Sequence, residues 1–166
     1  MNSNSVIFIM GVSGVGKSTI GNLLAEKLEI PFFDGDDYHP EANILKMSNK
    51  EPLTDEDRQP WLLRLNSLAK KELATHSCII GCSALKQVYR DILSKEIEHQ
   101  TIWIHLQGTF EEIMERLSKR SDHFMPAELL KSQFDTLQES DVSIDIDINF
   151  TPNEIVHLIM DALGTP

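Results

Sequence analysis

The fold of this chain is decided by the stretch Val6-Ile-Phe-Ile-Met10-Gly11-Val-Ser-Gly-Val-Gly-Lys17-Ser18-Thr19. Its leading apolar residues are typical of a buried strand, and the amphipathic run from Ile20 to Leu28 that follows is typical of a helix. The loop between them has the spacing GxxxxGK[ST], in which glycines allow consecutive backbone N–H groups to turn toward a polyphosphate. A strand, a glycine loop and a helix in this order predict a nucleotide-phosphate site, with an ordinary Gly-rich turn as the alternative.

Two side chains of this loop carry the expected chemistry. Lys17 is expected to reach the β- and γ-phosphates as a catalytic residue, and Ser18 to place its hydroxyl on Mg²⁺. The positive end of the following helix would point at the same anion. The residues expected to bind the nucleotide here are Gly11, Val12, Ser13, Gly14, Val15, Gly16, Lys17, Ser18 and Thr19. The loop indicates nucleotide use and leaves the acceptor of the phosphoryl group open.

Length and composition exclude several classes of protein. A chain of 166 residues predicts one domain over residues 1–166, large enough to bury a core without disulfide bonds. With 26 acidic and 15 basic residues the formal charge is −11, which argues against general nucleic-acid binding. No apolar run approaches the roughly 20 residues of a membrane span, and the start of the chain lacks a signal-peptide pattern. Because the two cysteines also suit a reducing compartment, we expect a cytoplasmic protein without membrane partners.

Strand-like apolar runs alternate with helical patterns along the chain. Each connection is long enough for a crossover helix, which predicts a three-layer α/β fold, a five-stranded parallel sheet with helices on both faces. The last run alternates apolar and acidic residues and is therefore expected at the sheet edge or exposed on one side. Ligands of such sheets bind beyond the carboxyl ends of the strands. The expected strands are Val6–Met10, Ile30–Phe33, Cys78–Cys82, Thr101–Leu106 and Ser143–Ile148.

Acidic residues follow the second expected strand, in the run Asp34-Gly-Asp-Asp-Tyr-His-Pro40. Asp34 and Asp36 are two residues apart, so in an extended chain their side chains face the same way. Phosphoryl transfer needs groups positioned and charge neutralised, which predicts Asp34 near Mg²⁺ and Asp36, as a catalytic residue, at the acceptor hydroxyl. His39 is a candidate substrate ligand; for Asp37 or His39 alone, a helix-capping turn is the alternative.

A resemblance to a known family is carried by the run His39-Pro-Glu-Ala-Asn-Ile-Leu-Lys-Met-Ser-Asn-Lys-Glu-Pro-Leu-Thr-Asp-Glu-Asp-Arg-Gln-Pro-Trp-Leu62. Together with the glycine loop it resembles the gluconate kinase (gluconokinase) family of small P-loop kinases, whose pattern is close to GVSGxGKS and then DGDxxHPxxNxxKMxxGxPLxDxDRxPWL. One departure is Asn49-Lys50, in a predicted turn, where the family has a glycine. The resemblance implies an adenylate/shikimate kinase-like P-loop NTPase fold, ATP and Mg²⁺ as cofactors, and gluconate as the substrate.

Arg58 is the most informative residue of this run. Thr54 is expected to cap a helix that carries Arg58 in its first turns, within a substrate-binding helical segment of about residues 39–75. A planar guanidinium can grip a carboxylate at two points, and gluconate differs from neutral sugars by having one. The alternative is a surface arginine paired with Asp55 or Asp57 at helical spacing.

The third expected strand leads into Ser83-Ala-Leu-Lys-Gln-Val-Tyr-Arg-Asp91, which is similar to the family's CSALKxxYRDxL. Lys86 and Arg90 are four residues apart and would share a helix face beyond the strand, so both are expected to bind the substrate anion. An exposed basic face is the alternative. Because no acidic residue ends this strand, Ser18 and Asp34 are expected to organise Mg²⁺.

Arginines precede a predicted lid after the fourth strand. The helical pattern of Phe110–Arg120 places Arg116 and Arg120 on one face. The pattern then breaks before a second helix of about residues 127–137, so a lid that closes over the phosphates is expected at about residues 120–127. Both arginines are expected to bind the nucleotide, with Arg120 also catalytic, and a solvated helix is the alternative.

The leading hypothesis is ATP-dependent phosphorylation of D-gluconate on its terminal 6-hydroxyl. One alternative is a P-loop kinase of another small acid such as shikimate, or of a nucleoside monophosphate, which need not have the DGDxxHP and DRxPW runs. A nucleotide-switch protein would carry an Asn-Lys-x-Asp motif, which is absent from the sequence, and a degenerate scaffold would have lost the charged residues named above. The sequence leaves open the role of His123 and a homodimer, which Trp61, Tyr89 or Phe134 can serve as readily as a core.

Overall fold

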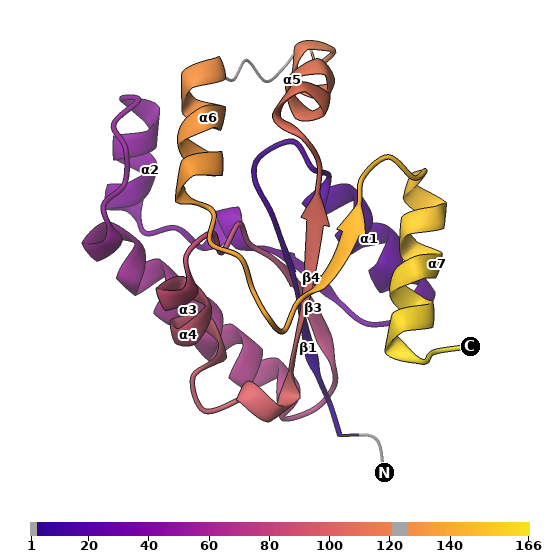
Figure 1. Cartoon of the computed structure of the whole chain (residues 1–166). Coiled ribbons are helices and arrows are strands. Elements are labelled where there is room, and N and C mark those ends of the chain that lie inside the picture. Colours follow the sequence, from indigo (N-terminus) through magenta and orange to yellow (C-terminus); the bar gives the residue numbers. More distant parts are fainter. Residues whose placement is uncertain (1–2, 121–125) are drawn as a thin grey trace.

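The computed structural model describes residues 3–120 and 126–166. Within these ranges five parallel strands form one sheet in the order β2-β3-β1-β4-β5 (Figure 1). They are β1 (Val6–Met10), β2 (Phe32–Asp34), β3 (Cys78–Gly81), β4 (Thr101–Gln107) and β5 (Ile144–Asp147). The strand that leads into the glycine loop is central, between β3 and β4, and β5 lies at the edge as its alternating pattern predicts.

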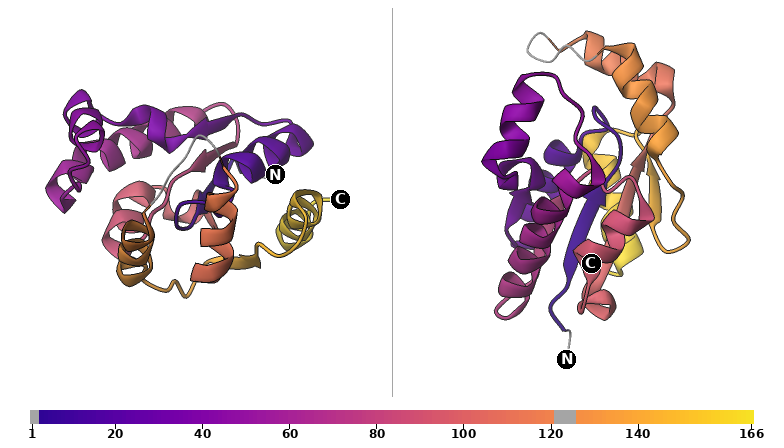
Figure 2. Two further views of the ribbon diagram at one scale, coloured as in Figure 1. Left: turned by 90° about the horizontal axis from the view of Figure 1, so that it is seen from above. Right: turned by 90° about the vertical axis from the view of Figure 1, so that its left-hand side faces the viewer.

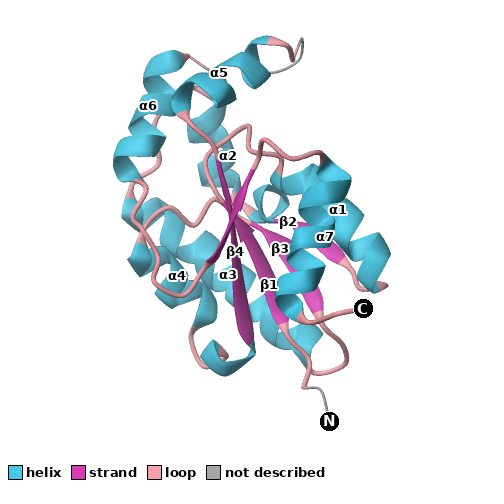
Figure 3. Cartoon of the chain, turned by 45° about the vertical axis from the view of Figure 1, so that its right-hand side comes forward, coloured by secondary structure: helices cyan, strands magenta, loops and turns pink. Residues whose placement is uncertain are grey.

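Helices cover both faces of the sheet, as Figure 3 shows. They are α1 (Lys17–Leu28) and α7 (Pro152–Leu163) on one face, and α3 (Asp55–Leu73) and α4 (Gln87–Ser94) on the other. Successive side chains of a strand point to opposite faces. Ile7 and Ile9 of β1 therefore join the core under α1 and α7, whereas Phe8 joins the core under α3 and α4. The three-layer α/β arrangement expected from the sequence is confirmed.

Further helices surround the carboxyl edge of the sheet, where β1 runs into the glycine loop (Figure 2). They are the 3-10 turn η1 (Gly35–Tyr38), α2 (Glu41–Ser48), α5 (Phe110–Ser118) and α6 (Ala127–Thr136); a second 3-10 turn, η2 (Glu98–Gln100), precedes β4. In Figure 1, α2, α6 and α5 rise above this edge, with the glycine loop among them. A ligand at the end of the central strand would thus meet helices from three parts of the chain.

Three helices begin at threonine caps. The side chains of Thr54, Thr109 and Thr151 each accept a hydrogen bond from the N–H three residues on, and the carboxylate there accepts one from the N–H of the threonine. Such capping boxes satisfy donors that the first turn of a helix leaves unpaired. The cap expected at Thr54 is confirmed, and Pro152 occupies the first position of α7, where its fixed φ suits a helix start.

Two of the aromatic residues that the sequence left between core and interface are buried. Trp61 and Tyr89 are 4% and 5% exposed and belong to the core under α3 and α4. Phe134 is half-buried and meets Phe110 edge to face, with ring centroids 6.0 Å apart, which joins α6 to α5. Within the described ranges no helix combines the length and the apolar composition needed to cross a membrane.

Candidate active site

The glycine loop between β1 and α1 is shaped by its glycines. Gly14 and Gly16 have φ values of 86° and 96°, which glycine adopts without strain. Two side chains of α5 also lie 3.0 Å from where a Cβ on Gly14 would sit, so a larger residue there would press on α5. Lys17 Nζ folds back onto the loop and donates to the carbonyl oxygens of Gly11 at 2.9 Å and Val12 at 3.1 Å. The ammonium group is thereby held against the loop that is expected to take the phosphates.

Ser18 and Asp34 meet at the first turn of α1. Ser18 Oγ donates to Asp34 Oδ2 at 3.0 Å, and Asp34 Oδ1 accepts the N–H of Asp36 at 3.0 Å. Hydroxyl and carboxylate oxygens suit Mg²⁺, which proteins commonly hold through one or two carboxylates together with substrate phosphates. Among residues 3–120 and 126–166 no group of three or more His, Cys, Asp or Glu side chains could hold a metal alone. The pair fits a metal ion that is bound partly by the nucleotide.

Asp36 does not follow Asp34 in an extended chain, as the sequence led us to expect. The chain turns after Asp34 into η1, whose backbone the Asp34 carboxylate caps. Desolvation by the surrounding chain nevertheless raises the pKa of Asp36, although the residue is exposed at the surface, and the charge of Asp34 raises it further while Lys17 opposes the shift. Burial also lowers the pKa of Lys17, with Asp36 the largest opposing charge. The structure therefore places an exposed carboxylate of raised pKa near the ammonium of the glycine loop.

A buried network holds the segment after β2 against α3. The indole N–H of Trp61 donates to the carbonyl oxygen of Gly35 at 2.7 Å, and the Trp61 ring stacks on His39 with centroids 4.1 Å apart. The Asn43 amide nitrogen lies 3.2 Å from His39 Nδ1. Burial, with a smaller effect from the charge of Arg58, lowers the pKa of His39 to about 4. His39 is therefore a neutral side chain at pH 7, near Arg58 and close in sequence to Asp36.

Two expected anion-binding residues, Arg58 and Lys86, lie against the ring of Tyr89. The guanidinium carbon of Arg58 is 5.5 Å from the ring centroid, and Lys86 Nζ is 5.6 Å from it. Lys86 pairs with Asp55 at 3.0 Å, and the Tyr89 hydroxyl donates to the same carboxylate at 2.5 Å. Arg58 donates to the carbonyl oxygen of Leu53 at 2.5 Å. The structure thus gathers two cations and one carboxylate at the start of α3.

Arg90 does not join this group, which corrects the expectation of a helix face shared with Lys86. Since α4 begins at Gln87, Lys86 lies outside the helix in extended backbone, and helical spacing does not relate the two side chains. Arg90 is 2% exposed, and burial lowers its pKa. Its guanidinium donates at 2.6–3.4 Å to the carbonyl oxygens of Ala84, Leu85, Gln138 and Glu139. Arg90 therefore joins the loop before α4 to the segment after α6, and its donors serve the fold.

The arginines expected to approach the phosphates lie at the end of α5. Arg116 and Arg120 are both exposed. Arg116 Nη2 donates to the carbonyl oxygen of Ile148, in the loop that leads to α7. Most of the expected lid at about residues 120–127, including His123, lies outside the described residues. The structure thus places Arg116 between α5 and the loop before α7, and Arg120 just beyond the end of α5.

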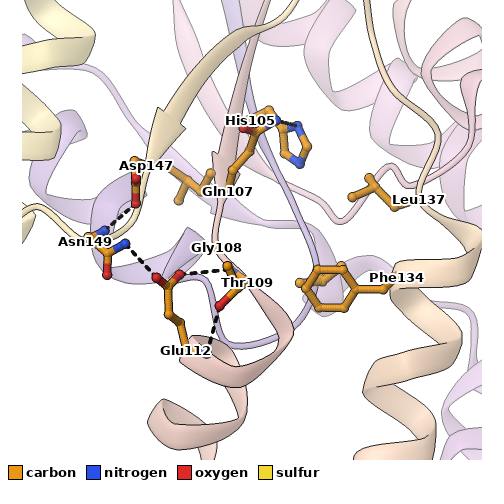
Figure 4. Close-up of a pocket in the computed structure, with 11 residues that line it drawn as sticks. His105, Gln107, Gly108, Thr109, Glu112, Phe134, Leu137, Asp147 and Asn149 are labelled. Atoms are coloured by element: carbon orange, nitrogen blue, oxygen red, sulfur yellow. Dashed lines mark hydrogen bonds between the residues drawn. The ribbon is translucent and has the colours of Figure 1, made fainter.

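A pocket of about 360 Å³ opens beside the glycine loop, at the carboxyl ends of β4 and β5 (Figure 4). Asp147 and Asn149 lie on one side of it, and Phe134 of α6 and Leu137, which follows α6, lie on the other. In the described part of the chain its lining includes Val12 of the glycine loop but none of the acceptor-side residues of η1 and α3. The pocket therefore borders the phosphate loop, on a different side from the carboxylate and cations described above.

Known proteins match this chain along most of its length. A family model described as Shikimate kinase matches residues 13–162. A thermosensitive gluconokinase of Escherichia coli (strain K12) is 50% identical over 151 residues, which cover 85% of this chain and 78% of that protein. A probable gluconokinase of Rattus norvegicus is 40% identical over an alignment of 186 residues, gaps included, that covers 98% of this chain and 100% of that protein. The chain belongs to the gluconokinase family.

A solved gluconokinase structure agrees with this membership. The protein from Sinorhizobium meliloti 1021 superposes with a TM-score of 0.86 at 37% identity, covering 99% of this chain and 94% of that one. The family resemblance drawn from the glycine loop and the DGDxxHP and DRxPW runs is confirmed. With it, the adenylate/shikimate kinase-like P-loop fold and the class of the enzyme, a phosphotransferase with an alcohol group as acceptor, are also confirmed.

Sequence reasoning missed the contacts that α6 makes in this gluconokinase family member. Gln133 bonds to Ser13 of the glycine loop, and Gln138 bonds to the first residue of α4. Both glutamines lie in the run Leu129-Leu-Lys-Ser-Gln-Phe-Asp-Thr-Leu-Gln138, after the predicted lid. That run does not reveal a partner 120 residues away in the chain.

Proposed function

We propose that this chain transfers the γ-phosphoryl group of ATP to the 6-hydroxyl of D-gluconate, giving 6-phospho-D-gluconate and ADP. The observation that carries the proposal is the position of Asp36, a solvent-exposed carboxylate of raised pKa near Lys17 of the glycine loop. Arg58 lies near His39, three residues further along the chain. Relatives that are 40–50% identical over most of the chain and bear the name gluconokinase supply the acceptor.

Charge neutralisation falls to the glycine loop. Lys17 would leave the carbonyl oxygens of Gly11 and Val12 and bind the β- and γ-phosphates. Ser18 and Asp34 would hold Mg²⁺, which when bound supplies positive charge against the phosphates. Arg116 and Arg120 would approach the same phosphates from the end of α5 as the lid predicted at about residues 120–127 closes and excludes water.

Asp36 would orient the acceptor hydroxyl. As the hydroxyl oxygen bonds to the γ-phosphorus and the bond to the β–γ bridging oxygen breaks, the hydroxyl proton passes to the Asp36 carboxylate. A free aspartate, with a pKa near about 4, is a poor base for this step. The raised pKa of Asp36, which follows first from desolvation, makes it a better one. The nearby Lys17 ammonium is then positioned to stabilise the departing charge.

The acid group of the substrate would meet Arg58 and Lys86. Their shared position on Tyr89 presents two cations, and the carboxylate of gluconate would compete with Asp55 for Lys86. His39, neutral and stacked on Trp61, would offer hydrogen bonds to substrate hydroxyls without adding charge. Arg90 takes no part in binding, because its donors are already bonded to backbone carbonyls.

A second candidate acceptor is favoured by the family model, whose description is Shikimate kinase. The test is ADP release, coupled to an optical readout, with Mg·ATP and a panel of acceptors: gluconate, other aldonates, shikimate, a nucleoside monophosphate, and glucose as the neutral control. Turnover confined to gluconate and its close analogues would support the proposal. Turnover on shikimate or a nucleoside monophosphate would overturn the assignment of gluconate as the acceptor. It would leave the proposed roles of the phosphate loop and Asp36 unchanged.

The proposed setting of the reaction is the cytoplasm. Cys78 and Cys82 are buried and free, and burial raises the pKa of both thiols to about 12. Such thiols stay protonated and inert, as suits a reducing compartment.

A further inference from the structure

Ser13 of the glycine loop is hydrogen-bonded to a side chain of α6, that of Gln133. The amide oxygen of Gln133 accepts the backbone N–H of Ser13 at 2.8 Å, and its amide nitrogen donates to Ser13 Oγ at 3.0 Å. One side chain thus bonds both polar groups that Ser13 offers on this side of the loop. The N–H of Ser13 points toward α6, so it does not join the N–H groups expected to surround the phosphates. This differs from the role that the sequence predicted for Ser13.

The end of α6 is itself anchored, which keeps the Gln133 amide in place. The N–H of Gln138 donates to the carbonyl oxygen of Leu85 at 2.8 Å, and its side-chain oxygen accepts the N–H of Gln87 at 2.7 Å. Arg90 adds a bond to the Gln138 carbonyl oxygen at 2.6 Å. Because these partners belong to the loop before α4 and to its first turn, α6 connects the phosphate loop to the acceptor side of the site.

The two hydrogen bonds between Gln133 and Ser13 are compatible with a bound nucleotide, whereas the hydrogen bonds that Lys17 makes to the loop carbonyls are not. Lys17 Nζ now bonds to the carbonyl oxygens of Gly11 and Val12, and it must leave them to bind phosphate. The Ser13 bonds to Gln133 use no phosphate-binding group, so they persist when the lysine moves. The loop beyond Ser13 carries two left-handed glycines, which offer little resistance to a change of shape.

We propose that Gln133 is a positioning residue for the nucleotide, acting through Ser13 to hold the glycine loop in the shape that receives the phosphates. The inference rests on the nucleotide use in the proposed function and not on the identity of the acceptor. Replacement by leucine removes both hydrogen bonds at similar volume. We expect Gln133→Leu to weaken Mg·ADP binding about tenfold, the effect of losing two neutral hydrogen bonds of ordinary strength.

Calorimetric titration of Mg·ADP into the full chain, without any acceptor, tests this inference. The variants are Gln133→Leu, Ser13→Ala, their double mutant, and Ser132→Leu as a control on the neighbouring exposed position of α6. We expect Ser13→Ala to weaken binding about threefold, because it loses one of the two bonds. The double mutant should bind no more weakly than Gln133→Leu, since the same contact is already lost. The control should bind as the wild type does.

A purely structural role for Gln133 gives a different result. In that case Tm would fall in Gln133→Leu while affinity for Mg·ADP stayed within about twofold of the wild type, and the inference would be overturned. Additive losses in the double mutant would overturn it too, because they would show that Ser13 and Gln133 act separately. If Gln133→Leu does not fold, an unchanged affinity of Ser13→Ala for Mg·ADP is enough to reject the role proposed for the Gln133–Ser13 contact. A lack of turnover on gluconate would instead overturn the proposed function and leave this inference standing.

Discussion

Arg90→Met should destabilise the fold and leave gluconate binding intact. The guanidinium of Arg90 is buried and holds four backbone carbonyl oxygens, from Ala84, Leu85, Gln138 and Glu139. Hydrogen bonds to a charged group each contribute about 1.5–3 kcal/mol, but the four share one charge whose burial is costly. We therefore expect a loss of about 3–5 kcal/mol, the range for breaking a buried charged network. For a chain of this size that lowers Tm by roughly 10–15 °C.

Urea unfolding followed by tryptophan fluorescence measures this loss, and steady-state kinetics below the transition measures the KM for gluconate. Arg90→Lys is expected to lose most of the same stability, because an ammonium lacks the planar fork that reaches several carbonyl oxygens. Lys95→Met, at an exposed position just after α4, is the matched control and should change neither quantity. A KM for gluconate raised tenfold or more in Arg90→Met, with the free energy of unfolding unchanged, would refute the structural role and restore Arg90 as a substrate ligand.

Three further predictions follow from the caps and the shifted pKa values. Thr54→Ala should lower the free energy of unfolding by about 1 kcal/mol, because it breaks the capping box of α3. Urea unfolding measures this loss, and an equal loss in Thr75→Ala would show that the cap is not the cause. Asp36→Asn should lower kcat at least a hundredfold with little change in the KM for ATP, and the wild-type kcat should fall as pH drops through the raised pKa of Asp36; a variant that retains kcat would exclude a role in proton transfer. His39, whose pKa is lowered to about 4 in the folded chain, contributes stability that is present above pH 6.5 and lost as pH falls toward 4. The loss reaches up to about 3 kcal/mol, and unfolding titrations of His39→Gln should lack this part of the pH dependence.

The sequence predicted the layers of the fold because the governing signals are local. An apolar run before the glycine loop, amphipathic runs after each strand, and threonine caps three residues before an acid all act within a few positions of the chain. The alternating acidic residues of β5 also predicted a strand at the sheet edge or exposed on one side, and it lies at the edge. The order of the strands could not be read from local patterns, because it depends on which parallel strands pair across long connections.

The site was predictable where it rests on spacing and less so where it rests on distant partners. Lys17, Ser18 and Asp34 gather at one edge because each follows directly from a strand end or the glycine loop. Arg90 was misassigned because its spacing from Lys86 holds only inside a helix, and α4 begins between them. Its carbonyl partners after α6 lie up to 49 residues away in the chain, so no local pattern announces them.

The relation of Asp34 to Asp36 shows how one hydrogen bond changes a local prediction. The alternation rule applies to extended backbone, but the Asp34 carboxylate accepts the N–H of Asp36 and bends the chain into η1. Aspartate readily makes such bonds to its own backbone, which is why it favours turns and caps. The functional prediction for Asp36 does not depend on the alternation. It depends on the closeness of Asp36 to Lys17 that the fold supplies.

The most direct test of the central claim is the identity of the product. The purified chain is incubated with Mg·ATP and D-gluconate, and ³¹P NMR follows the phosphorus signals as ADP forms. We expect a single new phosphomonoester, coupled to the C6 protons of gluconate, that grows in equal amount with ADP. ADP that appears with inorganic phosphate alone, or a phosphate ester on another position of the acid, would contradict the account of Asp36 and Arg58 given above.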